Sequence, residues 1–403
     1  MFFKNRNLVI AGYLGLLTLL FQACVEPFDI ETEIFESALV VEGTITNQLE
    51  TQEIKLSRTF RLESDRPAPE NGAKVKVVGD NGSEYDFDSI GEGIYKSNNP
   101  FEAQQGVNYS LNITTIGGRN YASQPTMLSG TSTIDNISAI KTSQSINGQV
   151  QDGIAILVNS KNTTSNNGYY RYSYNETYEV RSTYNVPNKL IFKDSVFEIV
   201  SKDKQDNICY TSKNSQDIIL ANTNMLDNNN IDKLPVRFIA KSNRILAFRY
   251  SILVKQFSLS REAYEFYDIL NEISSSESLF SQNQPGFING NVYSVDNPKE
   301  KVIGYFSVAP VDSKRFFFSF TDFYDVSERP PSEFDCTITR PEYPADMGVA
   351  RLILLIRSGA AQLVARADGS VSEEGSGPYR IADSRCIDCT LYGTTEVPEF
   401  WTE

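Results

Sequence analysis

The sequence predicts a mainly β protein, in which an amino-terminal β-sandwich is followed by a larger β-rich domain with one packed helix. Stretches of alternating apolar and polar residues recur about every ten residues between turn residues, as is typical of β-sandwiches. Asp80-Asn81-Gly82 separates two such stretches, and Asn-Gly supplies the positive φ angles of a tight hairpin turn. Apolar residues at helical spacing are clearest in residues 260–275.

The first domain is predicted over residues 38–130. Its alternating runs include ALVVEGTITN, TQEIKLSRTF and the hairpin AKVKVVGDNGSEYDF, and a second hairpin turns at Gly117-Gly118. The order of strands and turns in APENGAKVKVVGDNGSEYDFDSIGEGIY resembles the small Ig-like or prealbumin-like domains found beside outer-membrane receptors. We therefore expect an Ig-like or prealbumin-like β-sandwich here.

The larger domain is predicted over residues 131–403. The runs GIAILVNS, YYRYSYNETYEV and RILAFRYSILVKQFSLS are typical of strands, and Ser260 is placed to cap the helix that follows. Residues 183–206 and 211–235 are polar, and we expect long loops there. The pattern of residues 349–367 fits a strand and a helix equally well.

The amino terminus has the pattern of a bacterial lipoprotein signal. A basic start precedes an uncharged run at residues 8–21, which is shorter than the roughly 20 residues of a membrane-spanning helix. The sequence FQAC then resembles a lipobox, in which the cysteine becomes the first mature residue and is acylated. We predict a signal peptide at residues 1–23, lipid attachment at Cys24 and an acidic tether over residues 24–37. Several acyl chains on one residue anchor a protein stably, whereas a single chain does so only marginally.

Composition excludes several classes of function. The net charge of −14 and the pI of about 4.7 argue against nucleic-acid binding, which depends on Lys and Arg at phosphates. The chain has no histidine, which excludes Ser-His-Asp and Cys-His catalysis and any zinc site that needs imidazole. The run DNNNID, which starts at Asp227, lacks the glycine and the final Glu of an EF-hand loop. We therefore predict no cofactor, no metal site and no catalytic residues.

An aromatic stripe is predicted on one strand of the larger domain. Period-two spacing places four tyrosines on one face, namely Tyr170, Tyr172, Tyr174 and Tyr178. Such a stripe can stack on sugars, or it can pack against another sheet. The stripe is therefore either a ligand face or a packing face.

Four cysteines remain if Cys24 is lipidated: Cys209, Cys336, Cys386 and Cys389. Acidic neighbours raise the pKa of a thiol, which disfavours redox chemistry at the terminal Cys-x-x-Cys, and a Cys₄ zinc site needs a second close pair. An even number of cysteines in an exported chain favours structural disulfides, although four cysteines allow three connectivities. We expect both terminal cysteines to bond to distant partners and to clasp the end of the chain, with Phe400 and Trp401 packed beneath.

Several of these stretches together resemble a family of Bacteroidota lipoproteins that is defined only as a domain of unknown function. They are ALVVEGTITN, NGAKVKVVGDNG, RYSILVKQFSLSREAYEFYDIL, GNVYSVDNPKEKVIGYFSV and CIDCTLYGTTEVPEFW. Thr394 and Val397 depart from the family's more frequent Gly and Lys. The resemblance implies an outer-membrane lipoprotein, facing the cell surface, that accompanies a TonB-dependent transporter or a related barrel. It implies no reaction.

Two short motifs also resemble the O-glycosylation pattern of these bacteria. They are Asp88-Ser89-Ile90 and Asp194-Ser195-Val196, which makes Ser89 and Ser195 candidate glycosylation sites.

We therefore expect a non-enzymatic, lipid-anchored accessory subunit that docks on an outer-membrane β-barrel, either a TonB-dependent transporter or an assembly or secretion complex. Its membrane partner would be lipid, through Cys24. One alternative is a stand-alone glycan- or peptide-binding surface lipoprotein that uses the tyrosine face. Another is a carboxylate-dependent hydrolase, which would require a pair of buried carboxylates in a cleft.

Overall fold

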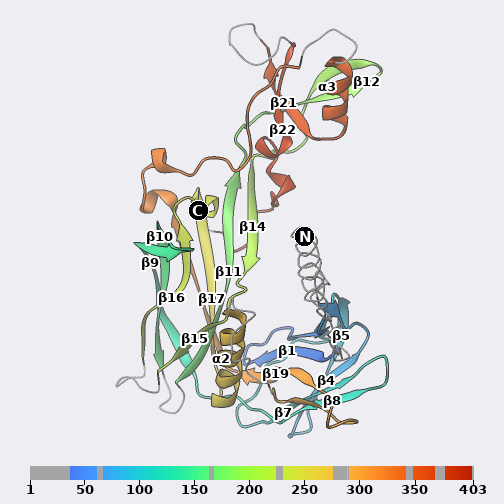
Figure 1. Cartoon of the computed structure of the whole chain (residues 1–403), viewed down its shortest axis with the longest axis vertical. Helices are drawn as coiled ribbons and strands as arrows, with labels where there is room; N and C mark the ends of the chain where they lie inside the picture. Colours follow the sequence, from blue (N-terminus) through green and yellow to red (C-terminus); the bar gives the residue numbers. More distant parts are fainter. Residues whose placement is uncertain are drawn as a thin grey trace, which may run out of the picture.

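The computed structural model describes residues 37–60, 67–162, 168–223, 230–275, 288, 290–341, 348–367 and 377–401. The fold is mainly β, as the sequence predicts. Figure 1 shows two β-sandwiches and a small unit at the far end, which we call the tip unit, arranged along the long axis. The signal peptide, Cys24 and nearly all of the predicted tether lie outside the described residues.

The first sandwich is a ten-stranded sheet that folds over its own core. Its order is β18-β8-β7-β4-β5-β6-β2-β1-β19, with β3 on β2, and only the β1–β19 pairing is parallel. Alternate residues of β1 and β4 are buried, which is the period of a strand with one face on the core. The strands are β1 (Leu39–Thr46), β2 (Glu53–Arg58), β3 (Ala68–Pro69), β4 (Lys74–Gly79), β5 (Glu84–Gly91), β6 (Ile94–Ser97), β7 (Tyr109–Thr114), β8 (Asn120–Ser123), β18 (Val292–Ser294) and β19 (Val302–Ala309).

Asn291 joins the two ends of this sheet. Its amide nitrogen donates to the carbonyl oxygen of Phe306 at 2.7 Å, and its amide oxygen accepts from the Phe306 backbone N–H at 2.8 Å. Asn291 precedes β18 and Phe306 lies on β19, so one buried side chain substitutes for a missing strand pairing.

We predict that Asn291→Ala lowers the free energy of unfolding by about 3 kcal/mol, because it leaves a buried N–H and C=O without partners. Urea denaturation measures this change. The exposed Asn99→Ala variant is the control, and its change should stay within about 0.5 kcal/mol. Equal effects in the two variants would contradict the closing role of Asn291.

The second sandwich packs a three-stranded sheet, β16-β10-β9, against a five-stranded sheet, β14-β11-β17-β20 with β15 on β11. Its core contains Ile154, Ile156, Tyr250 and Ile252, all fully buried. The strands are β9 (Ser132–Ile146), β10 (Gln149–Asn162), β11 (Tyr169–Arg181), β14 (Ile208–Asn214), β15 (Ile219–Asn222), β16 (Ile231–Ala240), β17 (Arg249–Ser258) and β20 (Val311–Ser319).

The two sandwiches share continuous structure at their junction. Strand β19 of the first sandwich passes through Pro310 directly into β20 of the second. Helix α2 (Arg261–Ser275) lies beside this point, where the sequence predicts a helix, and Ser260 caps it by accepting from the Ala263 N–H at 3.1 Å. Phe266 of the helix and Tyr305 of β19 share one apolar cluster, so α2 contacts both sandwiches.

The tip unit contains two hairpins and a helix around a small core of its own (Figure 1). The hairpins are β12–β13 (Asn188–Lys193 and Val196–Ser201) and β21–β22 (Ala361–Arg366 and Tyr379–Asp383), and the helix is α3 (Gly348–Arg357). The short 3₁₀ helices of the chain are η1 (Arg244–Leu246), η2 (Phe320–Asp322), η3 (Val326–Glu328), η4 (Ser384–Cys386) and η5 (Cys389–Leu391).

The structure corrects three expectations. Strands β18 and β19 belong to the first sandwich, although the sequence analysis places them in the larger domain. Local sequence patterns do not indicate which strands pair when the strands are far apart in the chain. Residues 183–206 contain the hairpin β12–β13, and residues 211–235 contain β15 together with parts of β14 and β16. A second helix, α3, accompanies α2: the ambiguous segment is a helix and then a strand, separated at Gly359, whose φ of +71° ends the helix.

Candidate functional site

The four tyrosines of the predicted stripe pack in the core of the second sandwich. Tyr170 and Tyr172 are 1% exposed, and Tyr174 and Tyr178 are 6% exposed. The Tyr172 hydroxyl donates to the Gln256 side chain at 2.7 Å, and burial raises its pKa well above the ordinary value. The structure therefore gives this face the packing role, and an external ligand cannot stack on it.

Two buried carboxylates lie on the same strand, β11, but they do not form a facing pair. Glu176 accepts from Arg237 Nε at 3.1 Å and from the Tyr250 hydroxyl at 2.7 Å, while Glu179 pairs with Arg181. Residues three apart on a strand point to opposite faces, so the two carboxylates cannot act on one substrate. The described residues hold no group of three or more acidic or cysteine side chains that could bind a metal ion.

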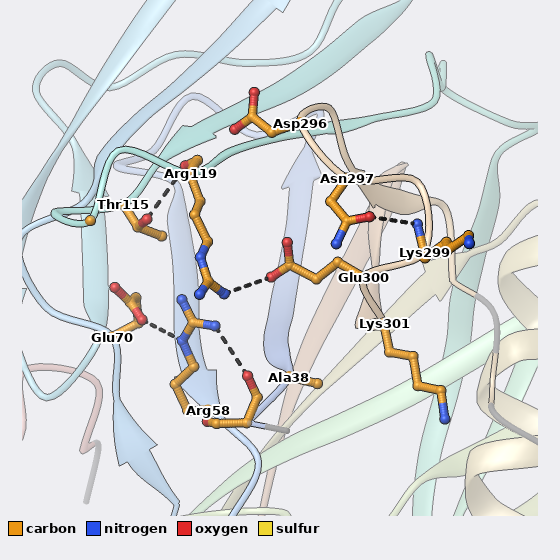
Figure 2. Close-up of a pocket in the computed structure, with 12 residues that line it drawn as sticks. Ala38, Arg58, Glu70, Thr115, Arg119, Asp296, Asn297, Lys299, Glu300 and Lys301 are labelled. Carbon is orange, nitrogen blue, oxygen red and sulfur yellow. Dashed lines mark hydrogen bonds and ion pairs between the residues drawn. The ribbon is translucent and has the colours of Figure 1, made fainter. Parts of the chain in front are cut away.

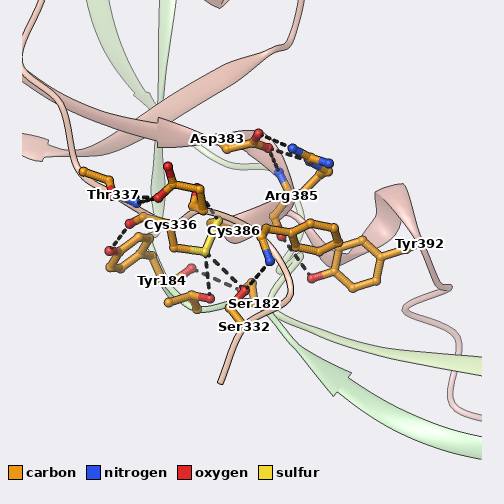
Figure 3. Close-up of a disulfide and its surroundings, with 12 residues drawn as sticks. Ser182, Tyr184, Ser332, Cys336, Thr337, Asp383, Arg385, Cys386 and Tyr392 are labelled. Carbon is orange, nitrogen blue, oxygen red and sulfur yellow. Dashed lines mark hydrogen bonds and ion pairs between the residues drawn. A yellow bond between two sulfur atoms is a disulfide. The ribbon is translucent and has the colours of Figure 1, made fainter. Parts of the chain in front are cut away.

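The cysteines form two disulfides, Cys209–Cys389 and Cys336–Cys386. Each terminal cysteine thus has a distant partner, the arrangement that the sequence analysis favoured. Figure 3 shows the second bond beside Tyr184, whose hydroxyl donates to the Cys336 carbonyl oxygen at 2.6 Å and whose backbone N–H donates to that of Cys386 at 2.9 Å. The two bonds therefore fix the base of the tip unit to the second sandwich.

The last residues lie across the outer face of the five-stranded sheet. Thr394 pairs with Tyr210 at the edge of β14. Trp401 contacts the rings of Tyr210 and Phe317 at centroid distances of 5.0 and 5.8 Å, and Phe400 lies against the guanidinium of Arg315. Residues 394–401, which we call the C-terminal segment, are therefore held by side-chain packing as well as by the two disulfides.

A charged pocket of about 830 Å³ lies at the edge of the first sandwich, close to Ser37, where the described chain begins (Figure 2). Arg58 pairs with Glu70 at 2.5 Å, and Arg119 pairs with Glu300 at 3.2 Å. Its two arginines are therefore neutralised by neighbouring carboxylates.

We predict that Glu300 stabilises the fold in a pH-dependent way. Burial opposes its ionisation, but hydrogen bonds from Tyr121 and Ser294 and the charge of Arg119 together lower its pKa from 4.5. A lowered folded pKa gives stability that is present above the unfolded pKa and is lost as pH falls through the folded value. The difference in unfolding free energy between wild type and Glu300→Gln, measured in urea, should therefore shrink as pH falls from 6 to about 3. A difference that does not change with pH would refute this role.

A cleft of about 770 Å³, which we call the junction cleft, lies between the two sandwiches. One wall comes from β1 and β19, and the other from β11, β17 and α2. Its lining is mixed: apolar side chains such as Phe266 and Leu270 alternate with Lys255 and with acidic residues that include Glu42 and Asp217. Ligand sites commonly form at such boundaries between domains.

Arg171 lines the junction cleft together with two other cations, Lys55 and Lys255. Its guanidinium lies over the rings of Phe257 and Tyr267, 4.5 and 4.9 Å from their centroids. Its only hydrogen bond within the described chain is a long one, 3.5 Å, from Nη2 to Thr44 Oγ1, and its buried Nε has no partner there. The sequence analysis missed Arg171, although the run YYRYSY places it on the opposite face of the strand from the buried tyrosines.

The candidate glycosylation residues are both exposed. Ser89 lies on β5, and Ser195 lies with Asp194 in the two-residue turn of the β12–β13 hairpin, where both have positive φ angles. Their surroundings leave the hydroxyls accessible, and their modification remains a prediction.

Residues 25–315 match the family described as Domain of unknown function (DUF4249). The chain belongs to this family. The DUF4249 match spans the first sandwich and the junction cleft and ends within β20, so Cys336, Cys386, Cys389 and helix α3 lie beyond it. No curated protein matches the sequence. Among the described residues, no helix has the length and apolar character needed to cross a membrane.

Proposed function

We propose that this DUF4249 protein is a non-enzymatic, lipid-anchored subunit of the outer membrane. It docks on an outer-membrane β-barrel, either a TonB-dependent transporter or an assembly or secretion complex, and faces the cell surface. Within that complex it captures a ligand or client in the junction cleft.

The observation that carries the binding role is the junction cleft itself. It lies between two sandwiches that share the continuous β19–Pro310–β20 segment, so its walls are held at a fixed spacing. It also presents a cation, Arg171, whose hydrogen-bonding capacity the described protein leaves largely unused. A preformed site of this kind binds without a large ordering cost.

The membrane role rests on the sequence. The FQAC motif supports acylation of Cys24, and the 14 residues 25–38 separate this cysteine from β1. A segment of that length spans at most roughly 46 Å, at about 3.3 Å per residue, so the first sandwich can reach a neighbouring barrel.

A stand-alone glycan- or peptide-binding lipoprotein is the second candidate. The tyrosine face, which the sequence analysis assigns to this candidate, is buried. A stand-alone binding protein would therefore also have to bind its ligand in the junction cleft. The two candidates therefore differ in whether a barrel is present.

A mild-detergent pull-down of the tagged, acylated protein from its own membranes tests the proposal. We expect a β-barrel protein to co-purify in stoichiometric amount, and Cys24→Ala to lose both the membrane association and the barrel. Recovery of the wild-type protein alone and monodisperse would overturn the docking role and favour the stand-alone candidate.

A further inference from the structure

We propose that the junction cleft binds a peptide and that Arg171 receives the peptide's terminal carboxylate. This inference rests on the proposed binding role of the cleft and names the ligand class. It assigns to Arg171 the function of fixing one end of the ligand.

Three separate segments position the guanidinium. Arg171 on β11 lies directly opposite Phe257 on β17 in the sheet register, and Tyr267 contacts the guanidinium from α2. Contact with two rings restrains the guanidinium, and its N–H donors point away from the ring faces and can form hydrogen bonds. The N–H donors of Arg171 are therefore held in place before a ligand binds, so binding costs little side-chain entropy.

The described part of the protein provides no carboxylate for this fork. Nε is buried without a partner, and Nη2 has only the 3.5 Å contact to Thr44 Oγ1 on the first sandwich. The arginines of the charged pocket differ, since Arg58 and Arg119 have their own glutamates. A carboxylate that accepts from Nη1 and Nη2 would form the bidentate pair that arginine favours, whereas the enclosed Nε offers no surface to a ligand.

The other groups of the cleft favour a ligand with a single negative charge. Glu42 and Glu53 line the walls but pair with Lys55 at 3.2 Å and with Lys96 at 3.9 Å, whereas Asp217 has no ion pair among the described residues and would repel a polyanion. The Asp217 carboxylate can accept a hydrogen bond from a backbone N–H group of a peptide, and Phe266, Leu270 and Ile218 offer apolar contacts for its side chains.

A glycan fits less well because the aromatic rings here are already engaged. Phe257 and Tyr267 lie against Arg171, Phe266 packs edge-on to Tyr267 at 5.5 Å, and Tyr305 lies 5.4 Å from Phe266. The rings that would stack on a sugar thus contact one another or the arginine. The cleft volume of about 770 Å³ is within the range of preformed ligand sites.

Calorimetry on the full acylated protein in detergent tests this assignment. The probe is an N-acetylated tetrapeptide of alanine, leucine and valine with a free terminal carboxylate, and the matched probe is its terminal amide. We expect the acid to bind at least about tenfold more tightly than the amide, since one charge-assisted bidentate contact is lost. Arg171→Gln should bind the acid about tenfold or more weakly and should not distinguish the two probes.

Two further variants separate a ligand contact from a structural role. Arg171→Lys keeps the charge but lacks the fork, and we expect it to bind the acid with intermediate affinity. Lys74→Gln removes an exposed cation on β4, outside the cleft, and should change affinity less than about threefold, as a charge without a direct contact does. If thermal unfolding shows that Arg171→Gln is misfolded, Arg171→Lys carries the test.

Equal binding of acid and amide, or unchanged selectivity in both Arg171 variants, would overturn the proposal. Binding of trigalacturonate that depends on Arg171, without binding of the peptide acid, would also overturn it in favour of an acidic glycan. The pull-down with Arg171→Gln distinguishes this failure from failure of the proposed function, because the variant should still recover the barrel if docking is correct.

Discussion

Replacing Cys209 and Cys389 together with alanine should lower the free energy of unfolding by about 5 kcal/mol. The bond closes a loop with a sequence separation of 180, and the chain-entropy model assigns about 5 kcal/mol to a loop of that size. It also holds η5 and the C-terminal segment against β14, so the variant should expose this segment to proteases. Urea denaturation and limited proteolysis measure the two effects.

The second disulfide provides the matched comparison. Cys336–Cys386 has a sequence separation of only 50, for which the same model gives about 4 kcal/mol, so the Cys336→Ala/Cys386→Ala variant should lose less stability. Fully reduced wild type lacks both bonds and should be the least stable of all. Loss of under 1 kcal/mol on removing Cys209–Cys389 would show that packing alone holds the end of the chain.

Arg237→Met should destabilise the second sandwich by about 3 kcal/mol, because it leaves the Glu176 carboxylate buried without its cation. The Tyr250 hydroxyl alone would then donate to that carboxylate. Urea denaturation of purified variants measures the loss.

The double variant Glu176→Gln/Arg237→Met is the control for this interpretation. Removing both charges avoids the uncompensated carboxylate, so the double variant should be more stable than Arg237→Met alone. A double variant that is less stable than the single one would mean that the loss arises from the Arg237 packing contacts, such as that with Tyr174, and not from its charge.

Local patterns predicted much of the fold because the period of two is strong in this chain. The hairpins at Asn81-Gly82 and Gly117-Gly118 and the capped helix after Ser260 are present where the sequence indicates them. The return of β18 and β19 to the first sandwich was not predictable, since β19 pairs with β1 across more than 250 residues and β18 pairs with β8 across more than 160. The hairpin β12–β13 was missed because its turn, Asp194-Ser195, lacks glycine and because polar segments flank its two short strands, NKLIFK and VFEIVS.

The candidate site was predicted less well than the fold. The tyrosine stripe was a candidate ligand face because aromatic residues on one face of a strand can stack on sugars. In the structure, packing between the two sheets buries these tyrosines. The residue on the other face of the same strand, Arg171, becomes notable only when β17, α2 and β1 bring Phe257, Tyr267 and Thr44 to it. A site assembled from three distant parts of the chain, namely β1, β11 and the consecutive β17 and α2, leaves no local motif.

The central claim is that the protein acts through the junction cleft as part of a membrane complex. Site-specific photo-crosslinking in intact cells tests it most directly, with the crosslinking residue at Asp217 in the cleft and, as control, at Val150, which is exposed on the β9–β10 hairpin. We predict that Asp217 yields a defined adduct with a barrel protein or a peptide, identified by mass spectrometry, and that Val150 does not yield it. The same adducts from both positions, or none from Asp217, would contradict the claim.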